Sequence, residues 1–189
     1  MPDLSALQPI TYDNPVAEFK AKAVNVAGAK LIEADKDEDL NNLIHSTVNS
    51  ASSASNATVG SFPADIIVAS NLPGIDAQLN PDTVECAQEL EKVDVGIIKG
   101  DIGVAENACI WIPQTMKERA VCFASQQLII ILRKDDIVNN MHEAYQRIAF
   151  NDYGYGTFIS GPSKTADIAQ VLVMGAQAAR SATVLLLDE

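Results

Sequence analysis

Two short apolar runs constrain the fold of this chain more than any other feature of its sequence. Leu128 to Leu132 reads LIIIL, and Val184 to Leu187 reads VLLL. Strands that are apolar at consecutive positions are typical of parallel sheets, in which both faces are covered by helices. Both runs are far too short to span a bilayer. We therefore predict an α/β fold in which the C-terminal strand, from Thr183 to Leu187, is buried.

The segments between and around these runs alternate between strand-like and helical patterns. Asn14-Pro15 is a typical helix start and Gly28 a typical helix end. The expected strands are 29–33, 66–69, 93–98, 108–112, 128–132, 156–160 and 183–187, and the expected helices are 14–29, 35–48, one from 81, 135–148 and 166–175. This alternation predicts a mixed, largely parallel sheet covered by helices. The small, polar stretch from Asn49 to Gly60 predicts an exposed loop.

Length, charge and cysteine content limit the functions that this chain can have. Its 189 residues, 48% of them hydrophobic, suffice for one globular domain, expected to cover residues 1–189. A net charge of −12 argues against nucleic acid and anionic membranes as partners. The N-terminus lacks a signal-peptide pattern, so we expect a cytoplasmic protein. The three cysteines form no Cys-x-x-Cys pair and no dinucleotide-binding glycine pattern is present, so we expect no bound metal or cofactor.

The junction GYGTFISGPSKTAD, residues 154–167, runs from an expected strand into an expected helix. We therefore expect it at the carboxyl ends of the sheet's strands, where ligands of such sheets bind. Pro162 and Ser163 separate Gly161 from Lys164, so the spacing of a nucleotide-binding phosphate loop is not met. Ser163 or Thr165 could cap the helix, and its free N–H groups together with Lys164 could receive a carboxylate or phosphate. Capping alone, with Asp167 complementing the helix dipole, is the other interpretation.

Four further side chains bear on possible chemistry. Glu106 lies on a glycine-containing loop between two expected strands, where it could act as a base or nucleophile, although such a residue is more often merely solvated. Arg180, just before the last strand, could neutralise an anionic ligand or pair with an acid. His45 and His142 are expected to be exposed or capping rather than catalytic.

The runs GYGTFISGPSKTADIAQVLVMGAQAARSATVLLLD, DIGVAENACIWI and LIIILRKDDIV resemble the lactate-utilization domain (LUD) family of the LutC/YkgG type, chiefly over residues 85–189. The resemblance implies a fold similar to that of the sugar-phosphate isomerases and CoA transferases (NagB/RpiA/CoA transferase-like). It also implies a role in oxidising L-lactate to pyruvate alongside separate iron–sulfur partner proteins.

The family motif also assigns residues. Its Ser/Lys-or-Arg/Thr-Ala-Asp stretch falls on Ser163 to Asp167, its acidic loop residue on Glu106 and its arginine on Arg180. This chain departs from the family pattern at three places. The usual Thr-Gly-Thr after the loop glutamate is Asn107-Ala108-Cys109, a usual glutamate is Ala169, and a usual His-Gly-Pro is Gln177-Ala178-Ala179. These departures remove an acid and an imidazole, which weakens the case for catalysis by this chain alone.

Three functions remain open. The first is an accessory protein of a lactate-oxidising system that binds a small carboxylate or phosphate, with iron–sulfur proteins as partners. The second is an independent enzyme of the CoA-transferase or phosphosugar type that uses Glu106. The third is an interaction module whose junction is purely structural.

Overall fold

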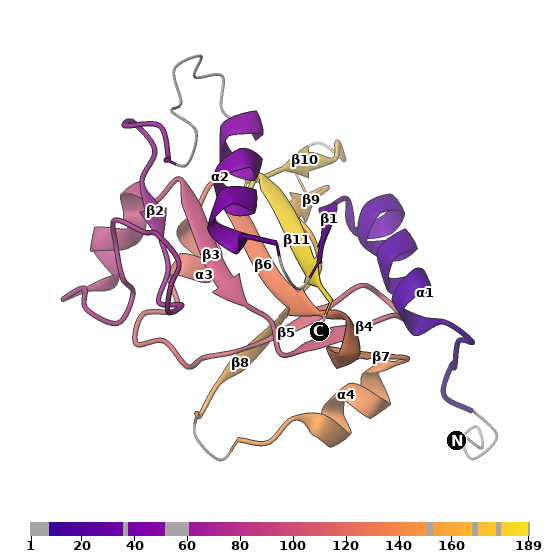
Figure 1. The fold of residues 1–189 in the computed structure, drawn as a ribbon. Coiled ribbons are helices and arrows are strands. Elements are labelled where there is room, and N and C mark those ends of the chain that lie inside the picture. The colour runs from indigo at the N-terminus through magenta and orange to yellow at the C-terminus, as the bar shows by residue number, and fades with distance from the viewer. Residues whose placement is uncertain are drawn as a thin grey trace.

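The computed structural model describes residues 8–35, 38–51, 61–150, 153–167, 170–176 and 179–188. Its centre is a five-stranded, fully parallel sheet (Figure 1). In spatial order, the strands are β1 (Lys30–Ala34), β11 (Ser181–Leu187), β6 (Gln127–Arg133), β3 (Val95–Lys99) and β2 (Val68–Ala69). The prediction of a mixed α/β fold with a largely parallel central sheet is confirmed.

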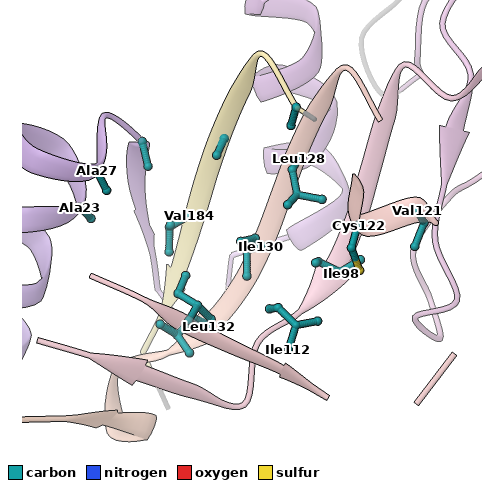
Figure 2. Packing of buried hydrophobic residues seen from close by; sticks show 14 of the residues in the cluster. Ala23, Ala27, Ile98, Ile112, Val121, Cys122, Leu128, Ile130, Leu132 and Val184 are labelled. Carbon is teal, nitrogen blue, oxygen red and sulfur yellow. The ribbon is translucent and has the colours of Figure 1, made fainter. Parts of the chain in front are cut away.

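The two apolar runs form neighbouring central strands that are buried on both faces. On one face of the sheet, Ile129 and Ile131 of β6 pack with Leu185 of β11. Helix α2 (Leu40–Ala51) covers this face with Ile44 and Val48. The alternate side chains of the two strands point to the opposite face: Leu128, Ile130, Leu132, Ala182, Val184 and Leu186. Figure 2 shows this opposite face packed against the first helix, β5 and α3 (Val121–Ala124). The predicted burial of the C-terminal strand is confirmed.

A second sheet of four strands packs against the parallel sheet. Its order is β7 (Ile137–Val138), β4 (Ile102–Val104), β5 (Ile110–Pro113) and β8 (Gly156–Ile159). The pairing of β4 with β7 is parallel, and the other two pairings are antiparallel. Helix α4 (Met141–Arg147) covers the far face, where Ala144 joins Val104, Trp111 and Val138 in a third apolar cluster. This second sheet was not anticipated from the sequence as a separate layer.

The first helix follows its predicted signals closely. Helix α1 (Pro15–Lys22) begins at Asn14, whose side chain accepts a hydrogen bond from the Ala17 N–H, with proline in the first turn. It continues as a π-helix, η2 (Ala23–Ala27), and ends at Gly28, whose φ of 74° lies in the left-handed region. This helix lies beside β1 at one edge of the molecule (Figure 1), so that its C-terminal end is close to the start of that strand.

Two of the predicted helices are wrong or shorter than expected. Between 135 and 148 the chain forms a 3-10 turn, η4 (Lys134–Asp136), then β7, and only then α4, which begins after Asn140. From 166 to 175 the described residues form no helix. Instead β9 (Lys164–Thr165) pairs with β10 (Val173–Met174) in an antiparallel hairpin. Gln170 and Gly175 have φ values of 57° and 73°, and left-handed residues interrupt a right-handed helix.

Smaller differences occur elsewhere. The segment after Pro81 forms turns and then the 3-10 helix η3 (Ala87–Lys92) rather than an α-helix. Within the predicted loop at 49–60, residues 49–51 belong to α2, and 52–60 lie outside the described residues. His142 is exposed as expected, but His45 is not: it is 4% exposed and stacks edge-on against Phe62. His45 faces inward because α2 turns this side toward the apolar cluster of Ile44 and Val48.

Among the described residues, no helix combines the length and the apolar character that a membrane crossing requires.

Candidate functional site

Glu106 lies at the tip of the β4–β5 hairpin, in a tight loop that closes with a hydrogen bond from the Val104 N–H to the Cys109 carbonyl. Within the loop, the Asn107 side chain accepts the Cys109 N–H at 3.0 Å. Ala108 has a φ of 55°, a left-handed conformation that favours glycine. The family pattern has glycine at this place, so the backbone geometry is one that its Thr-Gly-Thr sequence would adopt without strain.

The half-buried Glu106 side chain is anchored to helix α4. Its Oε2 accepts the N–H of Met141, the first residue of that helix, at 3.0 Å. The Glu106 N–H donates to the Asn139 carbonyl at 2.9 Å. Within the described residues, its second carboxylate oxygen, Oε1, accepts no hydrogen bond. Glu106 therefore binds the start of helix α4 with one carboxylate oxygen, a contact that was not among the roles considered for it from the sequence.

Lys22 is the cation closest to this loop, and sequence reasoning missed it. Its Nζ donates to the Glu106 carbonyl at 3.0 Å and to the Tyr12 hydroxyl at 2.8 Å, and lies 3.0 Å from Glu18 Oε1. The hydrogen bond to Tyr12 and the Glu18 carboxylate raise the pKa of Lys22, so it remains charged at neutral pH. The spacing of Glu18 and Lys22, four residues apart on a helix, is the one signal that could have marked it.

The beginning of the junction meets the Glu106 loop directly. The Ser160 hydroxyl, at the end of β8, donates to the Asn107 carbonyl at 3.1 Å. Cys109 lies between them and is half-buried. Burial raises the pKa of the Cys109 thiol, the nearby Glu106 charge adds to the rise, and a hydrogen bond with Ser160 opposes it. The thiol therefore stays protonated at neutral pH and is a poor nucleophile.

Gly161 and Lys164 join the junction to the end of the first helix. Gly161 has a φ of 67°, and a Cβ placed on it would lie 2.3 Å from the Ala27 carbonyl oxygen, so only glycine fits here. Lys164 Nζ donates to the Val26 carbonyl at 3.1 Å and to the Ala27 carbonyl. A lysine at the last carbonyls of a helix is stabilising. Lys164 thus caps the C-terminus of η2, not the N-terminus of a following helix.

The remaining junction residues make local contacts. The Ser163 N–H donates to Ala179 O, just before β11, and its carbonyl accepts the Gly175 N–H. Thr165 Oγ1 donates to Asp167 Oδ2 at 3.0 Å. Since Ala27 and Ala179 precede β1 and β11, the junction lies at the amino ends of these strands. The expectation of the carboxyl ends was wrong, because β8, which leads into the junction, belongs to the second sheet.

Arg180 is exposed and lies away from Glu106. It lines a cavity of about 250 Å³ together with Asp94, Gln126 and Gln127, at the starts of β3 and β6. Its side chain packs against Gly175, where an added Cβ would lie 2.3 Å from Arg180 Cγ. No contact joins it to Glu106 in the described part of the chain. Ala169, Gln177 and Ala178, three of the departures from the family pattern, lie outside the described residues.

We refer to Tyr12, Lys22, Glu106, Cys109 and Ser160, with the adjoining Gly161 and Lys164, as the Glu106 site. It joins three segments that are distant in sequence: the first helix, the β4–β5 loop and the junction. Within the described residues, no three His, Cys, Asp or Glu side chains gather in a way that could hold a metal ion. The site contains the Glu106 carboxylate, hydroxyl groups and two lysines, of which Lys22 already has three partners, Tyr12, Glu106 and Glu18.

Comparison with known proteins gives one family. A sequence model of the LUD domain matches residues 16–187. Lactate utilization protein C of Shouchella clausii (strain KSM-K16) is 31% identical over 124 residues, which cover 62% of this chain and 54% of that protein. Lactate utilization protein C of Oceanobacillus iheyensis is 29% identical over 106 residues, covering 52% and 45%. The chain therefore spans about half the length of these curated relatives.

A solved structure supports the fold. The crystal structure of a DUF162 family protein from Deinococcus radiodurans superposes with a TM-score of 0.62, covering 95% of this chain and 99% of that one. Its sequence identity of 14% makes this a likeness of fold alone.

Proposed function

The chain belongs to the LUD domain family, and we propose that it acts in lactate utilization, as an accessory protein that binds a small carboxylate at the Glu106 site. The names of its two curated relatives, each lactate utilization protein C, support the pathway. The proposal places the protein in the cytoplasm as a single domain and assigns electron transfer to separate iron–sulfur partner proteins. The ligand would be the substrate or product of lactate oxidation, L-lactate or pyruvate.

One observation carries the proposal of a ligand site. The family's two motif segments, more than fifty residues apart, meet at the end of the first helix through Ser160 and Asn107, and Lys164 binds the carbonyls of Val26 and Ala27. An ammonium group has three donors, and Lys164 uses two of them on these carbonyls. Its third N–H and the Ser163 hydroxyl are available to a carboxylate, while Glu106 Oε1 can accept a hydroxyl proton.

The contacts favour binding over catalysis. An acid or base needs a proton that it can exchange near neutral pH. The Cys109 thiol is held protonated, and the imidazole of the family pattern is replaced by Gln177. The alternative is a CoA-transferase-like enzyme with Glu106 as nucleophile. It is favoured by the Oε1 atom of Glu106, which accepts no hydrogen bond within the described residues. In that alternative Glu106 attacks acyl-CoA to form an anhydride, and the released CoA thiolate converts it to a glutamyl-CoA thioester with loss of the free acid. Incubation with acyl-CoA followed by hydroxylamine tests this, because the thioester would yield a Glu106 hydroxamate and release CoA.

Thermal unfolding with ligand tests the binding proposal. L-lactate or pyruvate should stabilise the protein by about 2.7 kcal/mol at a hundred times its dissociation constant. Lys164→Ala should abolish this gain and Lys164→Arg should retain it, whereas Lys92→Ala, an exposed lysine on η3, should change nothing. Lys164→Ala also loses the contacts with Val26 and Ala27, which can lower its stability even without ligand. For each protein, the stabilisation by ligand is therefore measured as the difference between unfolding with and without ligand. Absence of stabilisation of the wild type at millimolar concentrations would refute binding of these two ligands.

A further inference from the structure

We propose that a second, separate site binds a small molecule carrying a phosphate or carboxylate together with hydroxyl groups. A cavity of about 380 Å³ opens beside the second sheet, and none of its lining residues belongs to the Glu106 site. Its cationic side chains are Lys99, Arg133 and Arg147. The others that line it are Asp101, Ile102, Trp111, Asp136, Ile148 and Tyr153.

The cavity lies where parallel sheets bind ligands. Lys99 is the last residue of β3 and Arg133 the last of β6, and these two strands are paired in parallel. Their carboxyl ends therefore meet at one edge of the sheet, and ligands of open α/β sheets bind outside this edge. Arg147 is the last residue of α4, and Ile102 and Trp111 belong to the apolar cluster that this helix covers, so the cavity lies on the α4 side of the second sheet, next to the carboxyl edge of the parallel sheet.

The charges around the cavity favour an anion. Three cations face two carboxylates there, although the whole chain has a net charge of −12. Lys99 lies 3.4 Å from Asp101, and Arg133 Nε lies 3.7 Å from Asp136. The Lys99–Asp101 distance exceeds the roughly 2.7–2.9 Å of a charge-assisted hydrogen bond, so this pair is loose. Arg147 forms no ion pair with any described residue. Its guanidinium can bind a phosphate or carboxylate with two parallel N–H groups.

The other side chains specify what else the ligand carries. Asp101 and Asp136 are acceptors, so they suit hydroxyl groups of the same molecule. Trp111 and Ile148 give an apolar wall, and the indole N–H of Trp111 is already directed to the Tyr153 hydroxyl at 3.3 Å. The volume falls within the range of small-molecule pockets, about 300–1,000 Å³. A hydroxylated anion fits this combination of groups better than an inorganic ion alone.

The experiment uses Trp111, the only tryptophan of the chain, as a local reporter. Fluorescence titrations and isothermal titration calorimetry are carried out with glycerol 3-phosphate, glycerate and glycerol. We expect saturable binding of one or both anions and none of glycerol, and the tighter anion identifies phosphate or carboxylate as the preferred group. Arg147→Gln should weaken binding at least about tenfold, as loss of a charged hydrogen bond does.

Variants separate this site from the Glu106 site. Lys99→Gln should also weaken the binding, whereas Lys92→Gln, which removes the same charge outside the cavity, should not. Lys164→Ala should leave it unchanged, although that variant is expected to lose the response to lactate. Binding that persists undiminished in the Lys99→Gln/Arg147→Gln double variant overturns the proposal. So does the absence of both heat and fluorescence change with either anion in the wild type.

Discussion

Ala108 shows how the Glu106 loop constrains a single residue. The left-handed conformation at a φ of 55° costs an L-residue about 1–2 kcal/mol, and Ala108 is also buried, at 3% exposure. Alanine has the smallest side chain that suffers this cost. A β-branched side chain at the same φ would be a strong outlier.

We therefore predict that the protein tolerates glycine at position 108 and is destabilised by valine there. Ala108→Gly removes the strain but loses a buried methyl group, worth about 0.8 kcal/mol, so the free energy of unfolding should stay within about 1 kcal/mol of the wild type. Ala108→Val should lower it by about 2 kcal/mol or more. Urea unfolding of the three proteins measures both changes. Equal stability of the valine and glycine variants would contradict the left-handed geometry.

At the scale of an element, Asn140 explains why helix α4 begins where it does. Its side chain accepts the Glu143 N–H at 3.0 Å, and its amide donates to the Ile10 carbonyl at 2.8 Å. The Glu143 carboxylate accepts hydrogen bonds from the Asn139 N–H and from the side-chain amides of both asparagines. The sequence suggested Asp135 or Asp136 as the start, because an acid before a helical pattern is a common cap. The short strand β7 displaced the start, since Ile137 and Val138 pair with β4.

Removing this cap should destabilise the protein measurably. Asn140→Ala loses the cap, worth about 1 kcal/mol, and leaves the Ile10 carbonyl without its partner, so we expect a loss of about 2 kcal/mol. His142→Ala is the matched control, because His142 is exposed on the same helix and its loss should stay within about 0.5 kcal/mol. Thermal or urea unfolding compares the two variants. A loss no larger than that of His142→Ala would show that the cap contributes little.

An ion-pair network ties three strands of the molecule together at the carboxyl edge of the sheet. Glu33, in β1, pairs with Lys20 of α1 and with Lys134, which follows β6, and Lys134 also pairs with Asp188, which follows β11. Hydrogen bonds from Lys20 and then Lys134 hold the pKa of Glu33 below its ordinary value of 4.5, and the charges of the two lysines add to this effect, because both stabilise the carboxylate. The side chain is 42% exposed, so salt screens part of this effect.

The sign of the resulting pH dependence follows from proton binding. Between the folded and unfolded pKa values, the unfolded chain binds more protons at Glu33, so the free energy of unfolding rises with pH there. The contribution is fully present above a pH of about 4.5 and is lost as the pH falls through the folded pKa. Glu33→Gln should therefore lose more stability at about pH 6 than at about pH 3. Urea unfolding at both values measures the difference, which should shrink in high salt; an equal loss at both would contradict the network.

Sequence alone determined the largely parallel central sheet of this protein, because burial on both faces can be recognised from consecutive apolar residues. The runs at 128–132 and 184–187 fixed the centre of the sheet, and Asn14, Pro15 and Gly28 marked the first helix. These signals are local, because each one determines the structure only of residues a few positions away in the sequence. The residues around Glu106 and Lys164 were singled out from the local sequence, in two separate segments, and the family resemblance then assigned them to one motif set.

Only the tertiary structure decided what those residues contact. Lys22 reaches the Glu106 loop across more than eighty residues of sequence, a proximity that no local pattern encodes. The helix expected at 166–175 is replaced by a hairpin because Ser163 pairs with Ala179 and Gly175, and the left-handed residues Gln170 and Gly175 interrupt the helical pattern. Packing between distant segments also turned Lys164 toward the first helix and gathered Lys99, Arg133 and Arg147 around one cavity. Such contacts depend on the whole fold, since their free energy is gained only when the segments meet.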